Sequence, residues 1–189
     1  MSSTRPCSRR AASNDMLGSG MSSPHLIELG ALESDERELL QRARAAMSRA
    51  YNPYSGFYVG AAVRTGSGGT FAGAAVENAS FGLTICAEPG AIMRAYAEGG
   101  VDIRAIAVVG GASPEGAGEI VTPCGRCRQM IYEAGQVSGT DIAVLCANAD
   151  LSRVMKVKIS DLLPFAFGPA DLNVREKLDE FVSRAKGGS

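Results

Sequence analysis

The order in which helix-like and strand-like segments alternate constrains the fold of this chain more than any other feature. From about residue 34 the apolar pattern switches between helical spacing and strand-length runs. It predicts helices over residues 34–50, 85–98, 123–134 and 174–185, and strands over residues 57–65, 70–77, 103–109, 141–146 and 153–159. The strand–helix–strand–helix–strand middle predicts an α/β protein with a mixed sheet and helices packed on its faces.

The N-terminal part differs in composition from the rest. Residues 1–30 are rich in Ser, Gly, Arg and Pro and lack periodic apolar residues, so we expect a disordered tail there and a single domain over residues 31–189. Three arginines among its first ten residues weakly resemble a transit peptide. We favour the alternative of a dispensable tail or a misplaced start, because two internal methionines could each begin a chain.

Composition and charge narrow the classes of function. The 189 residues are 46% hydrophobic and 21% charged, which is typical of a soluble globular domain. The net charge of −1 gives no electrostatic basis for binding nucleic acid, and no apolar run approaches the ~18 residues of a membrane span. We therefore expect neither a nucleic-acid partner nor a membrane partner.

The five cysteines favour a reducing compartment. Their number is odd, and the N-terminus shows no apolar segment of a secretory signal. We therefore expect a cytoplasmic location and no disulfide framework. Cys146 falls within an apolar strand-like run, which indicates a buried small residue. The single histidine, His25, lies in the predicted tail, which argues against a Ser-His or Cys-His hydrolase.

Two short segments carry the pattern of a metal site. One is Cys86-Ala87-Glu88, and the other, after residues 89–122, is Pro123-Cys124-Gly125-Arg126-Cys127. Catalytic zinc takes three protein ligands and leaves a fourth position for water, and Cys86, Cys124 and Cys127 would supply three thiolates. Each falls at the start of a predicted helix, where free N–H groups and the helix dipole favour an anion. A structural zinc site or a redox pair is the alternative that the cysteines alone leave open.

The same arrangement, a ligand-x-Glu followed by Pro-Cys-x-x-Cys, is the signature of the zinc-dependent deaminases, and the flanking residues extend the match. Residues 51–62 read YNPYSGFYVGAA and residues 76–88 read VENASFGLTICAE; residues 123–129 read PCGRCRQ and residues 162–169 read LLPFAFGP. All four segments resemble cytidine deaminases of the short, three-cysteine form, in order, over about residues 36–172.

The resemblance implies a fold, an assembly and an activity. The fold would be a three-layer α/β/α sandwich around a mixed five-stranded sheet, and the assembly a homotetramer. The activity would be zinc-dependent hydrolysis of cytidine or deoxycytidine to uridine or deoxyuridine in pyrimidine salvage. Glu88 would take the proton of a zinc-activated water, pass it to ring N3 and then protonate the departing amine.

The resemblance also assigns the substrate contacts. Phe57 would help to form the pyrimidine pocket, the backbone of Ala87 would contact the base, and Glu77 would bind a ribose hydroxyl. Phe167 would reach into the site of a neighbouring subunit. From the residues alone, core packing would be the simpler interpretation of both phenylalanines.

Two positions depart from the family pattern. Ala75 stands where the family usually has an asparagine that grips the sugar with the glutamate, and Pro89 stands where it usually has an arginine that offsets the charge of the three thiolates. Arg126, between the two metal cysteines, is the expected substitute. Blasticidin S deaminases are similar in lacking that arginine and in carrying PCGRCRQ. A deaminase of a modified cytosine nucleoside or of such an antibiotic is therefore the alternative, followed by an inactive zinc-stabilised scaffold.

Overall fold

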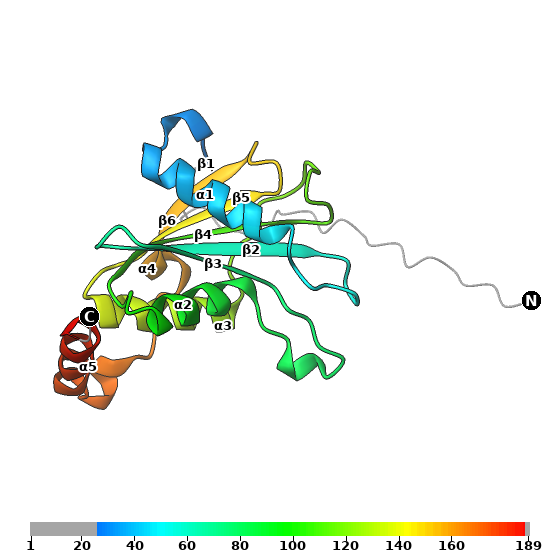
Figure 1. Ribbon diagram of the computed structural model, residues 1–189. Coiled ribbons are helices and arrows are strands. Elements are labelled where there is room, and N and C mark those ends of the chain that lie inside the picture. The colour runs from blue at the N-terminus through cyan, green and yellow to red at the C-terminus, as the bar shows by residue number, and fades with distance from the viewer. Residues whose placement is uncertain (1–25, 188–189) are drawn as a thin grey trace, which may run out of the picture.

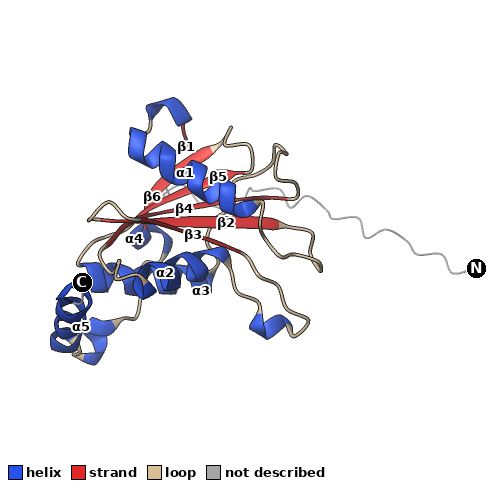
Figure 2. Ribbon diagram, in the orientation of Figure 1, coloured by secondary structure: helices blue, strands red, loops and turns tan. Residues whose placement is uncertain are grey.

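A computed structural model describes residues 26–187 of the chain. They form a six-stranded sheet with helices on both faces (Figures 1 and 2). In chain order the strands are β1 (Leu26–Ile27), β2 (Tyr58–Thr65), β3 (Thr70–Ala74), β4 (Ile103–Gly111), β5 (Ala143–Asn148) and β6 (Val154–Lys158). Across the sheet the order is β1-β6-β5-β4-β2-β3. The β4–β5 pair is parallel and the other neighbours are antiparallel, so the sheet is mixed.

The helices divide between the two faces of the sheet. Helix α1 (Ser34–Met47) covers one face, and α2 (Ala87–Ala97) and α3 (Gly125–Ser138) lie side by side on the other (Figure 1). The short α4 (Ile159–Leu162) and the C-terminal α5 (Arg175–Gly187) lie on the α3 side. Three 3₁₀ turns complete the described structure, at Leu29–Ala31, Phe81–Leu83 and Pro169–Leu172. Each face has its own apolar core.

Strand β4 shows why the pattern produces three layers. Its residues alternate between the two cores: Ile106 and Val108 pack on the α2–α3 side, whereas Ala107 and Val109 pack on the α1 side. A strand buried on both faces must be apolar throughout, and the run Ile103–Val109 is apolar at every position except Arg104. On α1, Leu39, Leu40, Ala43 and Met47 recur at helical spacing and fill the second core.

A glycine fixes how closely α2 approaches the sheet. A side chain added at Gly73 in β3 would place its Cβ 2.7 Å from the Ala87 carbonyl oxygen and 2.5 Å from the Ala91 nitrogen. Only a residue without Cβ fits there, so the first turn of α2 rests directly on β3. This contact positions the turn that carries Glu88.

The predicted fold class and element order are confirmed, with three corrections. Residues 159–162 form the short helix α4, where the pattern predicted the end of a strand and a loop. The sheet has six strands rather than five, because Leu26–Ile27 pairs with Met155 and Val154 at the edge of β6. For the same reason residues 26–30 do not belong to a disordered tail, and the expected boundary after residue 30 lies too late. The rest of the predicted tail, with Cys7 and His25, lies outside the described residues. Among the helices of residues 26–187, none has the length and apolar character of a membrane span.

Candidate active site

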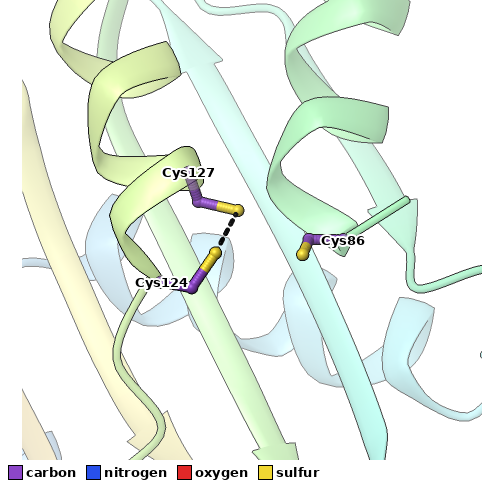
Figure 3. Close-up of side chains that lie close together, drawn as sticks. All are labelled: Cys86, Cys124 and Cys127. Carbon is purple, nitrogen blue, oxygen red and sulfur yellow. Dashed lines mark hydrogen bonds between the residues drawn. The ribbon is translucent and has the colours of Figure 1, made fainter. Parts of the chain in front are cut away.

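Two helix N-termini bring three cysteines together. Cys86 is the N-cap residue of α2, Cys124 is the N-cap residue of α3, and Cys127 lies in the first turn of α3. Figure 3 shows the three sulfurs facing the space between the two helices. Their Sγ atoms lie within 4.8 Å of one another, and the Cys124 and Cys127 sulfurs are 3.5 Å apart. The predicted grouping of these cysteines is present in the fold.

The arrangement fits a tetrahedral zinc ion. A Zn–S distance of about 2.3 Å in tetrahedral geometry separates two sulfurs by about 3.8 Å, which lies within the observed spread. Cys146 is not part of this group: it is fully buried in the core, where desolvation raises the pKa of its thiol to about 12. Within the described residues, no other group of three or more potential ligands is present. The site therefore offers three thiolates and a free fourth position, the pattern of a catalytic centre.

The electrostatics of the three sulfurs also favour a cation. A hydrogen bond from the Cys127 thiol, with a smaller contribution from Cys124 and the positive charge of Arg126, lowers the pKa of Cys86 to about 6. The pKa of Cys127 is raised, first because its proton is held by Cys86 and also because it is buried. One thiolate is thus stabilised, whereas a second beside it is disfavoured by repulsion. A divalent cation supplies the positive charge that lets all three ionise.

Glu88 lies beside the cysteines without belonging to their group. It is the second residue of α2, its side chain is 3% exposed, and burial raises the pKa of its carboxyl group. It lines a pocket of about 230 Å³ together with Cys86 and Cys124. A buried carboxyl group whose pKa is raised above its usual value is suited to both accept and donate a proton beside a metal site.

The same pocket contains three of the predicted substrate residues. Phe57, Ala75 and Glu77 line it with Glu88. The Glu77 Oε2 atom accepts hydrogen bonds from the backbone N–H groups of Tyr54, at 2.9 Å, and Ser55, at 3.2 Å, which fix the carboxylate in place. Hydrogen bonding, first from the Ser55 side chain, holds its pKa below the usual value, so the group is an anion at neutral pH.

Two predicted contacts are placed differently. Ala87 is fully buried in the core and is not among the residues that line the pocket, so the contact of its backbone with the base stays a prediction. Phe167 does not line the pocket of its own chain: it is 61% exposed, and its carbonyl oxygen accepts a 2.8 Å hydrogen bond from the Gln129 side chain. Its exposure leaves the ring available to another subunit.

Arg126 reaches across the site. Its guanidinium group donates a 3.4 Å hydrogen bond to the Thr84 carbonyl oxygen, two residues before Cys86. Pro89 occupies the first turn of α2, where its missing N–H breaks no helical hydrogen bond, and it is buried. The positive charge near the cysteines therefore comes from α3 rather than α2.

Sequence reasoning missed six lining residues: Ser55, Val59, Thr84, Ile85, Val121 and Thr122. Ser55 and Thr84 belong to the segments that resemble the family, but no pattern within the segments marks which side chains face the ligand. Val121 and Thr122 lie in the stretch before α3, whose path is set by packing against the sheet.

Comparison with known proteins gives a consistent family. The family model for the cytidine and deoxycytidylate deaminase zinc-binding region matches residues 33–140. The chain is 41% identical over 139 residues to a cytidine deaminase of Halalkalibacterium halodurans, an alignment covering 74% of this chain and 98% of that protein. It is 38% identical over 138 residues to a cytidine deaminase of Mycobacterium tuberculosis, covering 73% and 93%. The crystal structure of a cytidine deaminase from Burkholderia pseudomallei superposes with a TM-score of 0.59 at 40% identity, covering 69% of this chain and 97% of that one.

Proposed function

The chain belongs to the cytidine and deoxycytidylate deaminase family, and from that premise we propose how its residues deaminate cytidine and deoxycytidine. It is a zinc-dependent hydrolase that converts these nucleosides to uridine and deoxyuridine. The observation that carries this function is the cluster of three cysteine sulfurs beside a pocket that Cys86, Cys124 and the buried Glu88 line. The relatives at 38–41% identity are named cytidine deaminases, which supports this activity over the blasticidin S alternative.

Glu88 performs the proton transfers. Cys86, Cys124 and Cys127 would hold the zinc ion, which would supply the Lewis acidity that makes water nucleophilic near neutral pH. The Glu88 carboxylate takes a proton from the attacking water and delivers it to ring N3 as the oxygen adds to C4. It then carries the second proton to the amino group, which leaves as ammonia. Burial of Glu88 excludes bulk water from these transfers.

The rest of the pocket orients the nucleoside. Phe57 offers an aromatic wall for the pyrimidine, and the Ala87 backbone contacts the base. The fixed carboxylate of Glu77 accepts a hydrogen bond from a sugar hydroxyl, since one of its oxygens is already held by two backbone N–H groups. Ala75 lines the pocket where the family usually places an asparagine.

The substitution Ala75→Asn tests this placement of the sugar. An added amide within reach of a hydroxyl contributes about 0.5–1.5 kcal/mol, so KM for cytidine should fall by up to about tenfold with kcat nearly unchanged. Steady-state kinetics measures it, and Ala74→Asn, which changes the neighbouring residue outside the pocket, is the control. An unchanged KM in a folded Ala75→Asn protein would place the sugar elsewhere.

Arg126 offsets the negative charge of the metal site. Three thiolates and Zn²⁺ sum to −1, and Arg126 is the basic residue that reaches toward Cys86. A charge interaction at an exposed site contributes up to about 1 kcal/mol. We therefore expect Arg126→Ala to weaken zinc binding by up to about fivefold. Competition with a chelator of known affinity measures the change. Arg126→Lys should retain the wild-type affinity; an equal loss in both variants would mean that charge is not the cause.

The assembly that we propose is a homotetramer. Large apolar side chains near the pocket are exposed on the single chain: Tyr51, Tyr54, Phe57, Val76, Phe81 and Leu83. Patches of this kind are typical of protein interfaces. Light scattering should give about four times the 19.6 kDa chain mass, and Phe167→Ala should raise KM because the ring completes a neighbour's site. A fully active monomer would contradict this assembly.

The activity is tested with zinc-loaded protein and a panel of cytidine, deoxycytidine and blasticidin S. We expect ammonia release and loss of cytosine absorbance with the two nucleosides. Turnover of blasticidin S alone, or of none, would contradict the proposal. We place the reaction in pyrimidine salvage in the cytoplasm, a compartment that keeps free thiols such as Cys86 and Cys124 reduced.

A further inference from the structure

A second pocket, of about 300 Å³, lies at the open edge of the sheet and has no part in the chemistry above. Its lining residues come from the C-terminal end of α1 and the turn after it, from β3 and from α2. Strand β3 is the edge strand, and α1 and α2 lie on opposite faces of the sheet (Figure 1). We call this pocket the arginine groove. Three arginines line it: Arg42 from α1, Arg49 from the turn that follows α1, and Arg94 from α2. Its other lining residues are alanine and glycine. No acidic side chain lines it.

The charge of the groove is only partly neutralised. Arg42 and Arg94 form exposed ion pairs with Glu38, at 3.4 Å, and Glu98, at 2.9 Å, each four residues away on its own helix. Exposed ion pairs between neighbouring turns of a helix contribute little to stability, so these arginines exchange readily to a better anion. Arg49 forms no ion pair with any residue that the structure describes. The groove therefore presents one unpaired guanidinium group and two that a ligand can recruit.

The floor of the groove adds backbone donors. The Ala75 N–H donates to the Val59 carbonyl oxygen across the β2–β3 ladder, at 3.0 Å. In an antiparallel pair, the backbone groups of successive residues point alternately toward the partner strand and away from it. Ala72 and Ala74 pair in register with Ala62 and Gly60, and their N–H groups therefore point away from β2. Because β3 is the edge strand, these donors face the groove rather than another strand of the described sheet.

We propose that the arginine groove binds the phosphate chain of a phosphorylated small molecule, such as a nucleoside triphosphate. Guanidinium groups bind phosphate oxygens through paired hydrogen bonds, and the small residues leave the backbone N–H groups accessible. This ligand is not the substrate, since the nucleosides carry no phosphate and no lysine or arginine lines the substrate pocket. The inference goes beyond the proposed function and does not depend on it.

The groove adjoins the elements that build the active site. Ala74 lines the groove and the next residue, Ala75, lines the substrate pocket, while α2 carries both Arg94 and Glu88. An anion held by Arg49 and Arg94 links the turn after α1 to α2 across the edge of β3. Its binding therefore stabilises the folded state and raises Tm with ligand concentration.

Calorimetric titration of the zinc-loaded, full-length protein tests this with inorganic tripolyphosphate, ATP and adenosine. We expect the first two to bind and adenosine not to bind, and ATP and tripolyphosphate to raise Tm. Tighter binding of ATP would mean that the nucleoside is also recognised, and equal affinity would mean that the phosphate chain alone is; both outcomes support the site. Arg49→Ala should weaken binding at least about tenfold, because it removes a charged hydrogen-bond donor.

Arg44→Ala is the matched control, since it removes the same charge from α1 at a position outside the groove. Its affinity should stay within about twofold of wild type, as expected when only a screened long-range charge is lost. Absence of binding, or equal losses in Arg44→Ala and Arg49→Ala, would overturn the proposal. In either case the role left for the arginines would be to place charge beside the edge strand β3 and so prevent it from pairing with other chains. An anion that merely removes zinc from the protein would give the same signal in the wild type and in Arg49→Ala. The difference in signal between these two proteins therefore reports binding at the arginine groove.

Discussion

Replacing Glu88 with glutamine is expected to reduce kcat for cytidine by about 10²- to 10⁴-fold, the range that general acid–base groups contribute. Glutamine keeps the size and hydrogen-bonding capacity of the side chain but cannot accept and release a proton. Zinc content and Tm should stay near the wild-type values, because Glu88 is not one of the three ligands. Steady-state kinetics with metal analysis of the same sample measures both quantities.

The control for Glu88→Gln is the same change at Glu77. Both glutamates line the pocket, but we assign Glu77 to the sugar. Glu77→Gln should therefore raise KM for cytidine more than it lowers kcat. If Glu88→Gln kept near-normal kcat, or if both variants changed KM alone, Glu88 would not be the proton carrier.

Cys124→Ala is the second change with a large expected effect. Removal of one of three thiolates should reduce bound zinc to a small fraction of one per chain and reduce deamination to the limit of detection. The protein should also lose the rise in Tm that zinc gives the wild type, because metal binding free energy adds to folding free energy. Metal analysis after dialysis against a weak chelator, followed by thermal unfolding with and without zinc, measures these effects.

Cys146→Ala separates ligand loss from cysteine loss. Cys146 is fully buried in the core on the same side of the sheet but lies outside the sulfur group. Its replacement leaves a small cavity and lowers stability, while zinc content should remain at one per chain. Zinc retained by Cys124→Ala, or lost by a folded Cys146→Ala, would show that the ligand set is different.

The sequence predicted the layers well because periodicity reports burial. Ile103–Val109 had to be a buried strand, and Leu39, Leu40, Ala43 and Met47 had to share one helix face, and both are so. Strand β1 was not predicted, because two residues are too few to show an alternation of apolar and polar side chains. It forms only through its pairing with β6. Helix ends shifted by a few residues where caps rather than periodicity decide them, as at Cys124.

The metal site was predictable from spacing because its three ligands sit at two helix starts. The substrate pocket was predictable only through the family resemblance. Nothing in the local sequence places Phe57 and Ala75 on one cavity, since β2, β3 and the loop before α2 meet there through the register of the sheet. Thr84 and Thr122 were missed because loops follow the packing of distant residues. The arginine groove was missed for the same reason, as Arg94 meets Arg49 only across the sheet edge.

The central claim is hydrolysis at C4 of the cytosine ring by zinc-loaded protein, and isotope labelling tests it most directly. Deamination of cytidine in H₂¹⁸O, followed by mass spectrometry of the nucleoside, reports the origin of the new oxygen. We predict uridine that carries one ¹⁸O at C4, released together with one equivalent of ammonia. Unlabelled uridine, or no conversion of cytidine by protein with a full complement of zinc, would contradict the account.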